Sequence, residues 1–140
     1  MRRPRGAVNL VNTTLFLAVA AVAYLAWLYI PLWLDDLDVR EAVSIGFGQL
    51  SSGGPSLDTA RVQRAVADQL SRVGKHWEEK DGAPVEVPGL GVEPGDVVVE
   101  RAPDGKRGRV SVEYPRTVRL KPLDQSWTVH FHTEQEGFLK

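Results

Sequence analysis

Charged side chains are absent from residues 6–34, and most residues in this run are apolar. A helix of roughly 20 apolar residues crosses the hydrocarbon core of a bilayer. The helices of a small soluble domain, by contrast, are usually apolar on one face only. The pattern therefore predicts a transmembrane helix over residues 7–34.

A cleaved signal peptide is the alternative, because such a signal also opens with basic residues followed by an apolar run. The small residues at positions 18–23 offer cleavage sites, but cleavage there would leave a bare apolar stretch at the start of the mature chain. The run is also longer than the roughly 7–15 apolar residues of a signal peptide. We therefore expect the helix to be retained.

The charges at the two ends of the run predict its orientation. Arg2, Arg3 and Arg5 precede it, and acidic residues follow it at once. Positive charge is retained on the cytoplasmic side of a membrane, whereas acidic residues contribute little to this rule. We expect residues 1–6 to form a cytoplasmic basic tail and residues 35–140 to lie outside the cytoplasm.

Aromatic side chains gather at the distal end of the predicted span. Tyr24, Trp27, Tyr29 and Trp33 fall within its last eleven residues, and amphipathic rings favour the membrane–water interface. Pro31 lies among them, where it removes one backbone donor and is expected to bend the helix. These five residues, with the three arginines, are the expected membrane anchor and interface.

Two helical patterns follow the span. Residues 35–50 have a broadly helical period and are expected to extend the transmembrane helix outward, until residues 51–55, SSGGP, break it. Residues 57–73 then repeat apolar side chains at three- and four-residue steps. We expect an amphipathic helix there, with Ser56 as its N-cap.

The remainder of the chain alternates in the manner of strands. Residues 75–96 hold seven glycines or prolines and are expected to be mostly loop, with short local pairing near residues 85–87. Residues 97–100, 110–120 and 127–132 alternate apolar and polar side chains. Pro115 cannot donate to a ladder, so it predicts a bulge or an edge position. The result is a three-stranded antiparallel meander with one face available to the second helix.

The predicted fold class is therefore α+β. Its parts are a basic tail (1–6), a transmembrane helix (7–34), a helical extension (35–50) and a small extracytoplasmic α+β domain (51–140). A long helix that starts in the membrane, a second helix and a meander together resemble a type IV pilin.

The chain is also similar to an uncharacterised family of small bacterial single-pass membrane proteins. The similar segments are Arg5-Gly6, YIPLWL from Tyr29, VREAV from Val39, VSVEY-x3-VRLKPL from Val110 and TVHFH from Thr128. A true prepilin has Glu five residues after its processing glycine, and Val11 stands at that position here. The resemblance thus implies shape and topology in a bacterial cytoplasmic membrane, without membership of a working pilus.

Composition removes several kinds of chemistry. The chain has no cysteine, which excludes disulfides, thiol nucleophiles and Cys-ligated metal sites. Its formal net charge of −1 gives no basic stripe for nucleic acid. His130 and His132 share one face of a predicted strand, a spacing used by metal sites, but a third ligand would have to come from His76, Glu134 or Asp124. Outward polar positions on the meander are the simpler interpretation.

These patterns predict a protein that is not an enzyme and needs no cofactor. We expect a non-catalytic single-pass membrane protein whose partners are the lipid bilayer and other membrane or envelope proteins. It would serve as a structural or accessory subunit of a larger assembly. The alternative is an extracytoplasmic metal- or ligand-sensing domain that uses His130 and His132.

Overall fold

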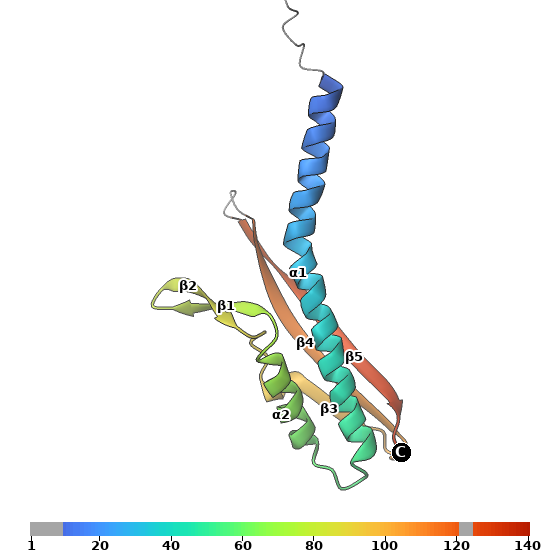
Figure 1. Ribbon diagram of the computed structural model, residues 1–140. Coiled ribbons are helices and arrows are strands. Elements are labelled where there is room, and N and C mark those ends of the chain that lie inside the picture. Colours follow the sequence, from blue (N-terminus) through green and yellow to red (C-terminus); the bar gives the residue numbers. More distant parts are fainter. Residues whose placement is uncertain (1–9, 121–124) are drawn as a thin grey trace, which may run out of the picture.

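A computed structural model describes residues 10–120 and 125–140. One long helix runs the length of the molecule, and its C-terminal half packs against an antiparallel sheet and a second helix (Figure 1). The elements are α1 (Leu10–Ser52), α2 (Thr59–Leu70), β1 (Lys75–Lys80), β2 (Ala83–Pro88), a 3-10 turn η1 (Pro94–Asp96), β3 (Val97–Arg101), β4 (Arg107–Leu120) and β5 (Gln125–Phe138). The α+β class and the pilin-like arrangement expected from the sequence are confirmed.

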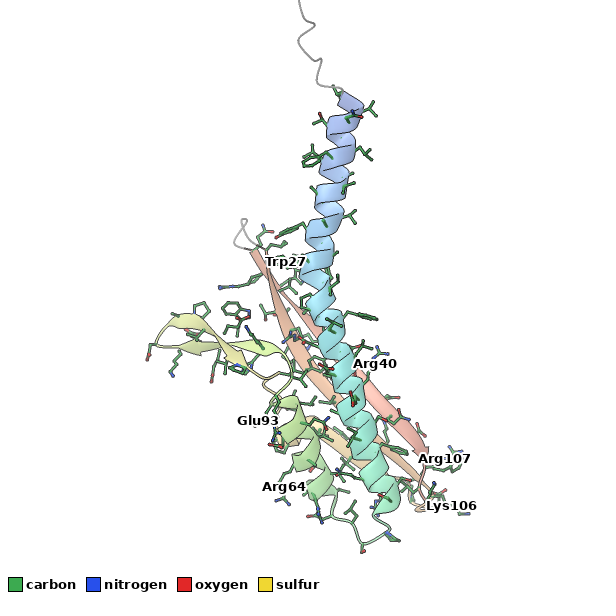
Figure 2. All side chains as sticks on the ribbon, viewed as in Figure 1. Trp27, Arg40, Arg64, Glu93, Lys106 and Arg107 are labelled. Carbon is green, nitrogen blue, oxygen red and sulfur yellow. The ribbon has the colours of Figure 1, made fainter. Side chains whose placement is uncertain are left out.

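Helix α1 has two halves with different surroundings. From Leu10 to Leu34 its large side chains stand out on all sides (Figure 2), and it is the one helix in the described residues that is long and apolar enough to cross a membrane. From Asp36 onward, residues at helical spacing are buried against the domain. The helix is unbroken at Pro31 and ends at Ser52, within the predicted breaking segment.

Helix α2 begins later than the sequence predicts. Its N-cap is Asp58, whose side chain accepts a hydrogen bond from the Ala60 N–H at 3.0 Å, so the expectation that Ser56 caps the helix was wrong. Asp and Ser are both good caps, because each offers a side-chain oxygen to the unpaired N–H groups of the first turn. The backbone bond from the Leu57 N–H to the Gly54 carbonyl, at 3.4 Å, places Ser56 within a turn before the helix.

The main sheet has the order β3-β4-β5, and all neighbours are antiparallel. Val110, Val112, Tyr114 and Val118 form a buried row on β4, as the alternation predicts. Strand β3 pairs only with residues 108–112 of β4, so the following half of β4 has no strand on that side among the described residues. Pro115 lies in this edge segment, and the register with β5 continues through it without a bulge.

The prediction of a mostly irregular segment at residues 75–96 was wrong in its first half. Strands β1 and β2 form a hairpin that projects sideways from the domain (Figure 1), with Trp77 opposite Glu86. Its two-residue turn is Asp81-Gly82, and both residues have positive φ, 54° and 77°. Asp-Gly is the preferred sequence for such a turn because its twist matches that of the strands. The signal was present at residues 81–82 but was obscured by the neighbouring prolines and glycines.

The core lies between α1, α2 and the sheet, and it depends on a close approach of the two helices at Gly46. A β-carbon added at Gly46 would lie 2.4 Å from Cγ2 of Val66, which is closer than real side chains come. Gly48, two residues further on and on the exposed side of α1, would meet no atom within 4 Å. The two glycines therefore differ in the room that surrounds them, although they share one helix.

We predict opposite effects on stability for alanine at these two positions. Gly46→Ala should lower the free energy of unfolding by about 1–2 kcal/mol, because overpacking typically costs 1–3 kcal/mol and the gain in helix propensity offsets up to about 1 kcal/mol. Gly48→Ala should raise it by about 0.5–1 kcal/mol. Denaturant unfolding of the full-length protein in detergent, followed by near-ultraviolet circular dichroism, measures both. An equal gain for both variants would contradict the close helix contact.

Candidate functional site at the helix–domain junction

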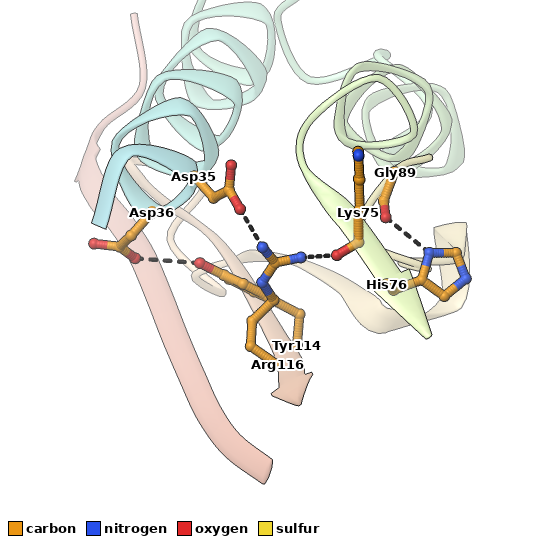
Figure 3. A network of polar contacts seen from close by, with 7 residues as sticks. All are labelled: Asp35, Asp36, Lys75, His76, Gly89, Tyr114 and Arg116. Atoms are coloured by element: carbon orange, nitrogen blue, oxygen red, sulfur yellow. Dashed lines mark hydrogen bonds and ion pairs between the residues drawn. The ribbon is translucent and has the colours of Figure 1, made fainter. Parts of the chain in front are cut away.

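Polar side chains meet where α1 leaves its apolar run and enters the domain (Figure 3). Arg116, on β4, donates to the Asp35 carboxylate on α1 and to the backbone carbonyl of Lys75 on β1. The Arg116 side chain is 10% exposed and that of Asp35 is 17% exposed. One guanidinium therefore joins three elements that are far apart in the sequence.

The neighbouring carboxylate, Asp36, forms a second set of contacts. Arg40 binds it one helical turn later, at 2.7 Å, while the Tyr114 hydroxyl donates to it at 3.3 Å and the Thr133 hydroxyl at 3.4 Å. These last two groups come from β4 and β5, respectively. Buried carboxylates are stable in a fold only when they are paired and hydrogen-bonded, and Asp36 meets that condition with partners from the same helix and from two strands.

Tyr114 is the central side chain beneath this pair of aspartates. Its ring stacks on Phe131 of the adjacent strand, with centroids 5.5 Å apart and planes 15° from parallel. Burial, reinforced by the negative charge and hydrogen bond of Asp36, raises the pKa of the Tyr114 hydroxyl well above its usual value. The hydroxyl therefore remains a proton donor to Asp36 at any physiological pH.

Burial also raises the pKa of the Asp35 carboxyl, and it outweighs the opposing effect of Arg116. The charge of Asp38 acts in the same direction as burial. A carboxyl whose pKa is raised by folding contributes most to stability below its unfolded pKa, near 4, and this contribution is lost as the pH rises through the folded value. The attraction between Asp35 and Arg116 is therefore opposed by the desolvation cost of burying the Asp35 carboxylate.

The base of the β1–β2 hairpin is fixed beside the network. The His76 ring bonds the Gly89 carbonyl at 2.7 Å through Nδ1, and the Gly89 N–H donates to the Gly74 carbonyl at 3.0 Å. Gly74 has a φ of +61°, and a β-carbon there would lie 2.8 Å from the Asp35 carboxylate. Glycine at this position thus allows the hairpin to start directly against the ion pair.

Sequence reasoning did not find this junction. Asp35, Asp36 and Asp38 appear in the sequence as an acidic flank outside the membrane, yet the first two are drawn into the domain. One signal was available: Arg116 has the same even position along β4 as Val112, Tyr114 and Val118, so alternation alone places it on the inward face. A charged residue in a row of buried positions requires a partner of opposite charge.

The expected membrane-interface residues of α1 lie on its exposed half. Trp27 and Trp33 are 74% and 62% exposed, and Tyr24 lies beside Trp27 with ring centroids 6.5 Å apart. Tyr29 is also exposed. Arg2, Arg3 and Arg5 lie outside the described residues, and the membrane role of the whole set stays a prediction.

The expected histidine pair lies on the outer face of the sheet, away from the junction. His132 Nε2 is 3.2 Å from Glu134, whose carboxylate also binds Arg109 at 2.6 Å. The hydrogen bond from His132 and the charge of Arg109 lower the pKa of Glu134. His130 has a different acidic neighbour, Glu113, at 3.9 Å.

The histidines therefore do not share a third ligand in this arrangement. In residues 10–120 and 125–140, no three His, Asp or Glu side chains are grouped so that they can hold a metal ion. Of the three candidates for a third ligand, His76 bonds Gly89 and Glu134 is shared with Arg109, while Asp124 lies outside the described residues. The simpler interpretation, that these are polar side chains on a solvent-facing sheet, accounts for each of their contacts.

Comparison of the chain with protein-family models, with curated proteins and with solved structures finds no match. What the structure shows is an architecture consistent with that of a pilin: a long apolar N-terminal helix followed by a short helix and an antiparallel sheet. What the junction can do follows from its contacts alone. Its charged groups face one another, and together they fix the direction in which α1 leaves the domain.

We predict that removing the Arg116 cation destabilises the fold in a pH-dependent way. Arg116→Met should cost about 3 kcal/mol at pH 7, because it leaves the Asp35 carboxylate buried without a partner. Loss of Arg116 removes the influence that lowers the pKa of Asp35, so the carboxyl accepts a proton more readily in the folded state. The cost should therefore be small at pH 4 and should grow as the pH rises to 7.

Arg40→Met provides the matched control for this measurement. The Arg40 side chain also binds an aspartate of α1, but it is 66% exposed. Without it, Asp36 keeps the hydrogen bonds of Tyr114 and Thr133, so the loss should be nearer the roughly 1 kcal/mol of a solvent-exposed cation. Denaturant unfolding of wild type and both variants at pH 4, 5.5 and 7 tests the difference. A cost for Arg116→Met that matches that of Arg40→Met, or that does not change with pH, would contradict the described pairing.

Proposed function

We propose that this protein is a non-catalytic, single-pass membrane protein of the bacterial cytoplasmic membrane, and that it holds a small rigid domain outside the cytoplasm to bind partner proteins. The observation that supports this most directly is the continuity of α1, which is exposed and apolar from Leu10 to Leu34 and then forms part of the domain core. A domain built around the end of its own anchor has a fixed direction relative to the membrane.

The contacts at the junction support a structural role of this kind. A flexible tether would let the domain swing freely, whereas Asp35 and Asp36 bind side chains from β4 and β5 immediately after the apolar run. The rotation of the domain about the α1 axis is thereby set by charge pairs as well as by apolar packing. Such geometry suits a subunit that presents one particular surface to a neighbour in a membrane assembly.

The outer face of α1 is the best-supported partner surface. Within the domain, the side of the helix opposite the core carries Leu37 and Ile45, which are 41% and 43% exposed. Gly48, also on this side, leaves the backbone open. An apolar stripe on a helix that continues into the membrane can pack against a partner helix along its length.

The proposed topology predicts opposite labelling of the two ends of the chain. Because the protein has no cysteine, Pro4→Cys and Lys140→Cys each introduce a single reactive thiol. In intact spheroplasts, a membrane-impermeant maleimide should label the C-terminal cysteine, and it should label the N-terminal one only after lysis. The positive-inside rule gives this direction, and the reverse pattern would overturn the proposed orientation.

The proposed partner surface predicts a complex that depends on the outer face of α1. Full-length protein purified from membranes in a mild detergent should be recovered with a stoichiometric membrane or envelope protein, identified by mass spectrometry. Leu37→Ser combined with Ile45→Ser should reduce this recovery about tenfold or more, since each truncation removes roughly 1 kcal/mol or more of apolar burial.

Val98→Ser is the matched control, because Val98 is 44% exposed but lies on β3, away from α1. It should leave recovery of the partner unchanged. A wild-type protein that is recovered as a free monomer would count against the proposed function. Equal loss with the control would place the partner surface elsewhere.

A further inference from the structure

A groove opens between the membrane half of α1 and the end of the sheet. Residues of α1 from Tyr24 to Leu32 form one wall, and Val118 and Arg119 near the end of β4 form the other. Trp77 of the β1–β2 hairpin closes one side, and the groove encloses about 300 Å³. Figure 2 shows Trp27 beside the ends of β4 and β5, which reach back along the helix toward its apolar half.

The level of this groove along α1 places it at the surface of a bilayer. A hydrocarbon core of roughly 30 Å corresponds to about 20 helical residues at 1.5 Å per residue. Counted from residue 7, where the predicted span begins, this length ends near Trp27, which lines the groove. Given the anchoring role proposed above, the groove spans the boundary between acyl chains and headgroups.

The charge in the groove is suited to a phosphate. The Arg119 guanidinium lies over the Trp77 ring, 4.7 Å from its centroid, and within the described chain it forms no ion pair with a carboxylate. Glu86, the acidic residue in the lining, is bound to Lys75 at 3.4 Å. Arginine donates to phosphate oxygens through two parallel N–H groups, and its contact with the indole leaves its edges able to do so.

The apolar wall fits an acyl chain better than it fits another protein. Tyr24, Trp27 and Leu28 line the groove. From there α1 continues toward Leu10 as an exposed apolar surface, so an acyl chain whose phosphate meets Arg119 can lie along the helix. A helix with its side chains is about 10–12 Å across and packs along an extended apolar seam. The groove is short, and a cation and the hairpin tryptophan limit it on one side.

We infer that this groove seats a phospholipid of the outer leaflet, with Arg119 on the lipid phosphate and the chain against α1. The domain then touches the membrane at two places, through α1 and through the lipid held by the end of the sheet. The inference rests on the proposed membrane anchoring and adds the lipid surface as a specific ligand of the domain.

Quenching of Trp77 by brominated lipids tests this inference. Full-length protein with phenylalanine at Trp27, Trp33 and Trp127 retains Trp77 as its sole tryptophan. It is placed in phosphatidylcholine nanodiscs that contain increasing fractions of phosphatidylglycerol or phosphatidylcholine brominated on the upper acyl chain. We expect half-maximal quenching by phosphatidylglycerol at about one fifth of the fraction that phosphatidylcholine requires, the preference typical of one arginine near anionic lipid.

Two arginine variants test whether the preference for phosphatidylglycerol depends on Arg119. Arg119→Gln should abolish the preference for phosphatidylglycerol. Arg107→Gln should preserve it, because Arg107 also lies over an aromatic ring, Phe138 at 5.1 Å, but at the opposite end of β4. Equal quenching by both lipids in the parent protein, or a preference that persists without Arg119, would overturn the inference.

A second single-tryptophan variant distinguishes the absence of a lipid site from the absence of membrane anchoring. When Trp27 is the sole tryptophan, it should be quenched wherever α1 spans the bilayer. Quenching of Trp27 without quenching of Trp77 would overturn the lipid site while leaving the anchor intact. Loss of quenching at both positions would refute the anchoring on which the inference depends.

A photo-crosslinking residue at Thr117, with all four tryptophans retained, gives an independent test in cells. Thr117 lines the groove and is exposed, so the substitution leaves the core intact. Crosslinks to phospholipid are the expected result. Crosslinks to a protein would overturn the inference, because a partner chain would then occupy the groove.

Discussion

The pairing of Asp35 with Arg116 is the constraint on which the arrangement of the helix and the domain depends. Isolated charges are expensive to bury, and Asp35 follows an apolar run that cannot supply a partner. Strand β4 supplies it from 81 positions later in the chain. The same guanidinium holds the first residue of β1, so the helix, the sheet and the hairpin meet at one buried charge.

The two neighbouring carboxylates, Asp35 and Asp36, both attach α1 to the domain, but they do so through different contacts. Asp35 pairs with a buried cation, and burial disfavours its charged form. Asp36 binds an exposed arginine and accepts hydrogen bonds from the hydroxyls of Tyr114 and Thr133. The first contact fixes the hairpin side of the domain and the second fixes its β5 side. Two consecutive residues on a helix point about 100° apart, so together they define the rotation of the domain about α1.

Close apolar packing, in addition to the charge pairs, holds the helices against the sheet. Gly46 lets α2 approach α1, and the buried row on β4 covers both helices. The sheet is longer than this core requires, because β4 continues beyond Tyr114, its last residue in the core cluster, toward the apolar half of α1. That extension forms the groove at Trp77 and Arg119, and it is the part of the fold that a soluble domain of this size would not need.

Local sequence patterns predicted some elements of the fold correctly and others only in part. The period of residues 57–73 predicted α2, and the alternation around Val110 and Val118 predicted β4, because each pattern reports a buried face with its own repeat. Of the β1–β2 hairpin, only local pairing near residues 85–87 was predicted, although Asp81-Gly82 specified the turn, since prolines and glycines on both sides favoured a loop. The N-cap was displaced by two residues because Ser56 and Asp58 are equally suitable acceptors and only the path of the chain selects between them.

The sequence by itself determined the long apolar helix, the second helix, the meander and the absence of cysteine chemistry, because these depend on composition and on short repeats. The tertiary structure alone decided that Asp35 and Asp36 turn into the domain, where Arg116 pairs with Asp35 and the Tyr114 and Thr133 hydroxyls bind Asp36. It also decided that His130 and His132 face different carboxylates, and that the end of the sheet lies against the apolar half of α1. The physical reason is that contacts between different elements leave no periodic trace in the sequence. Asp35 and Arg116 are 81 positions apart, and only folding brings their charges together.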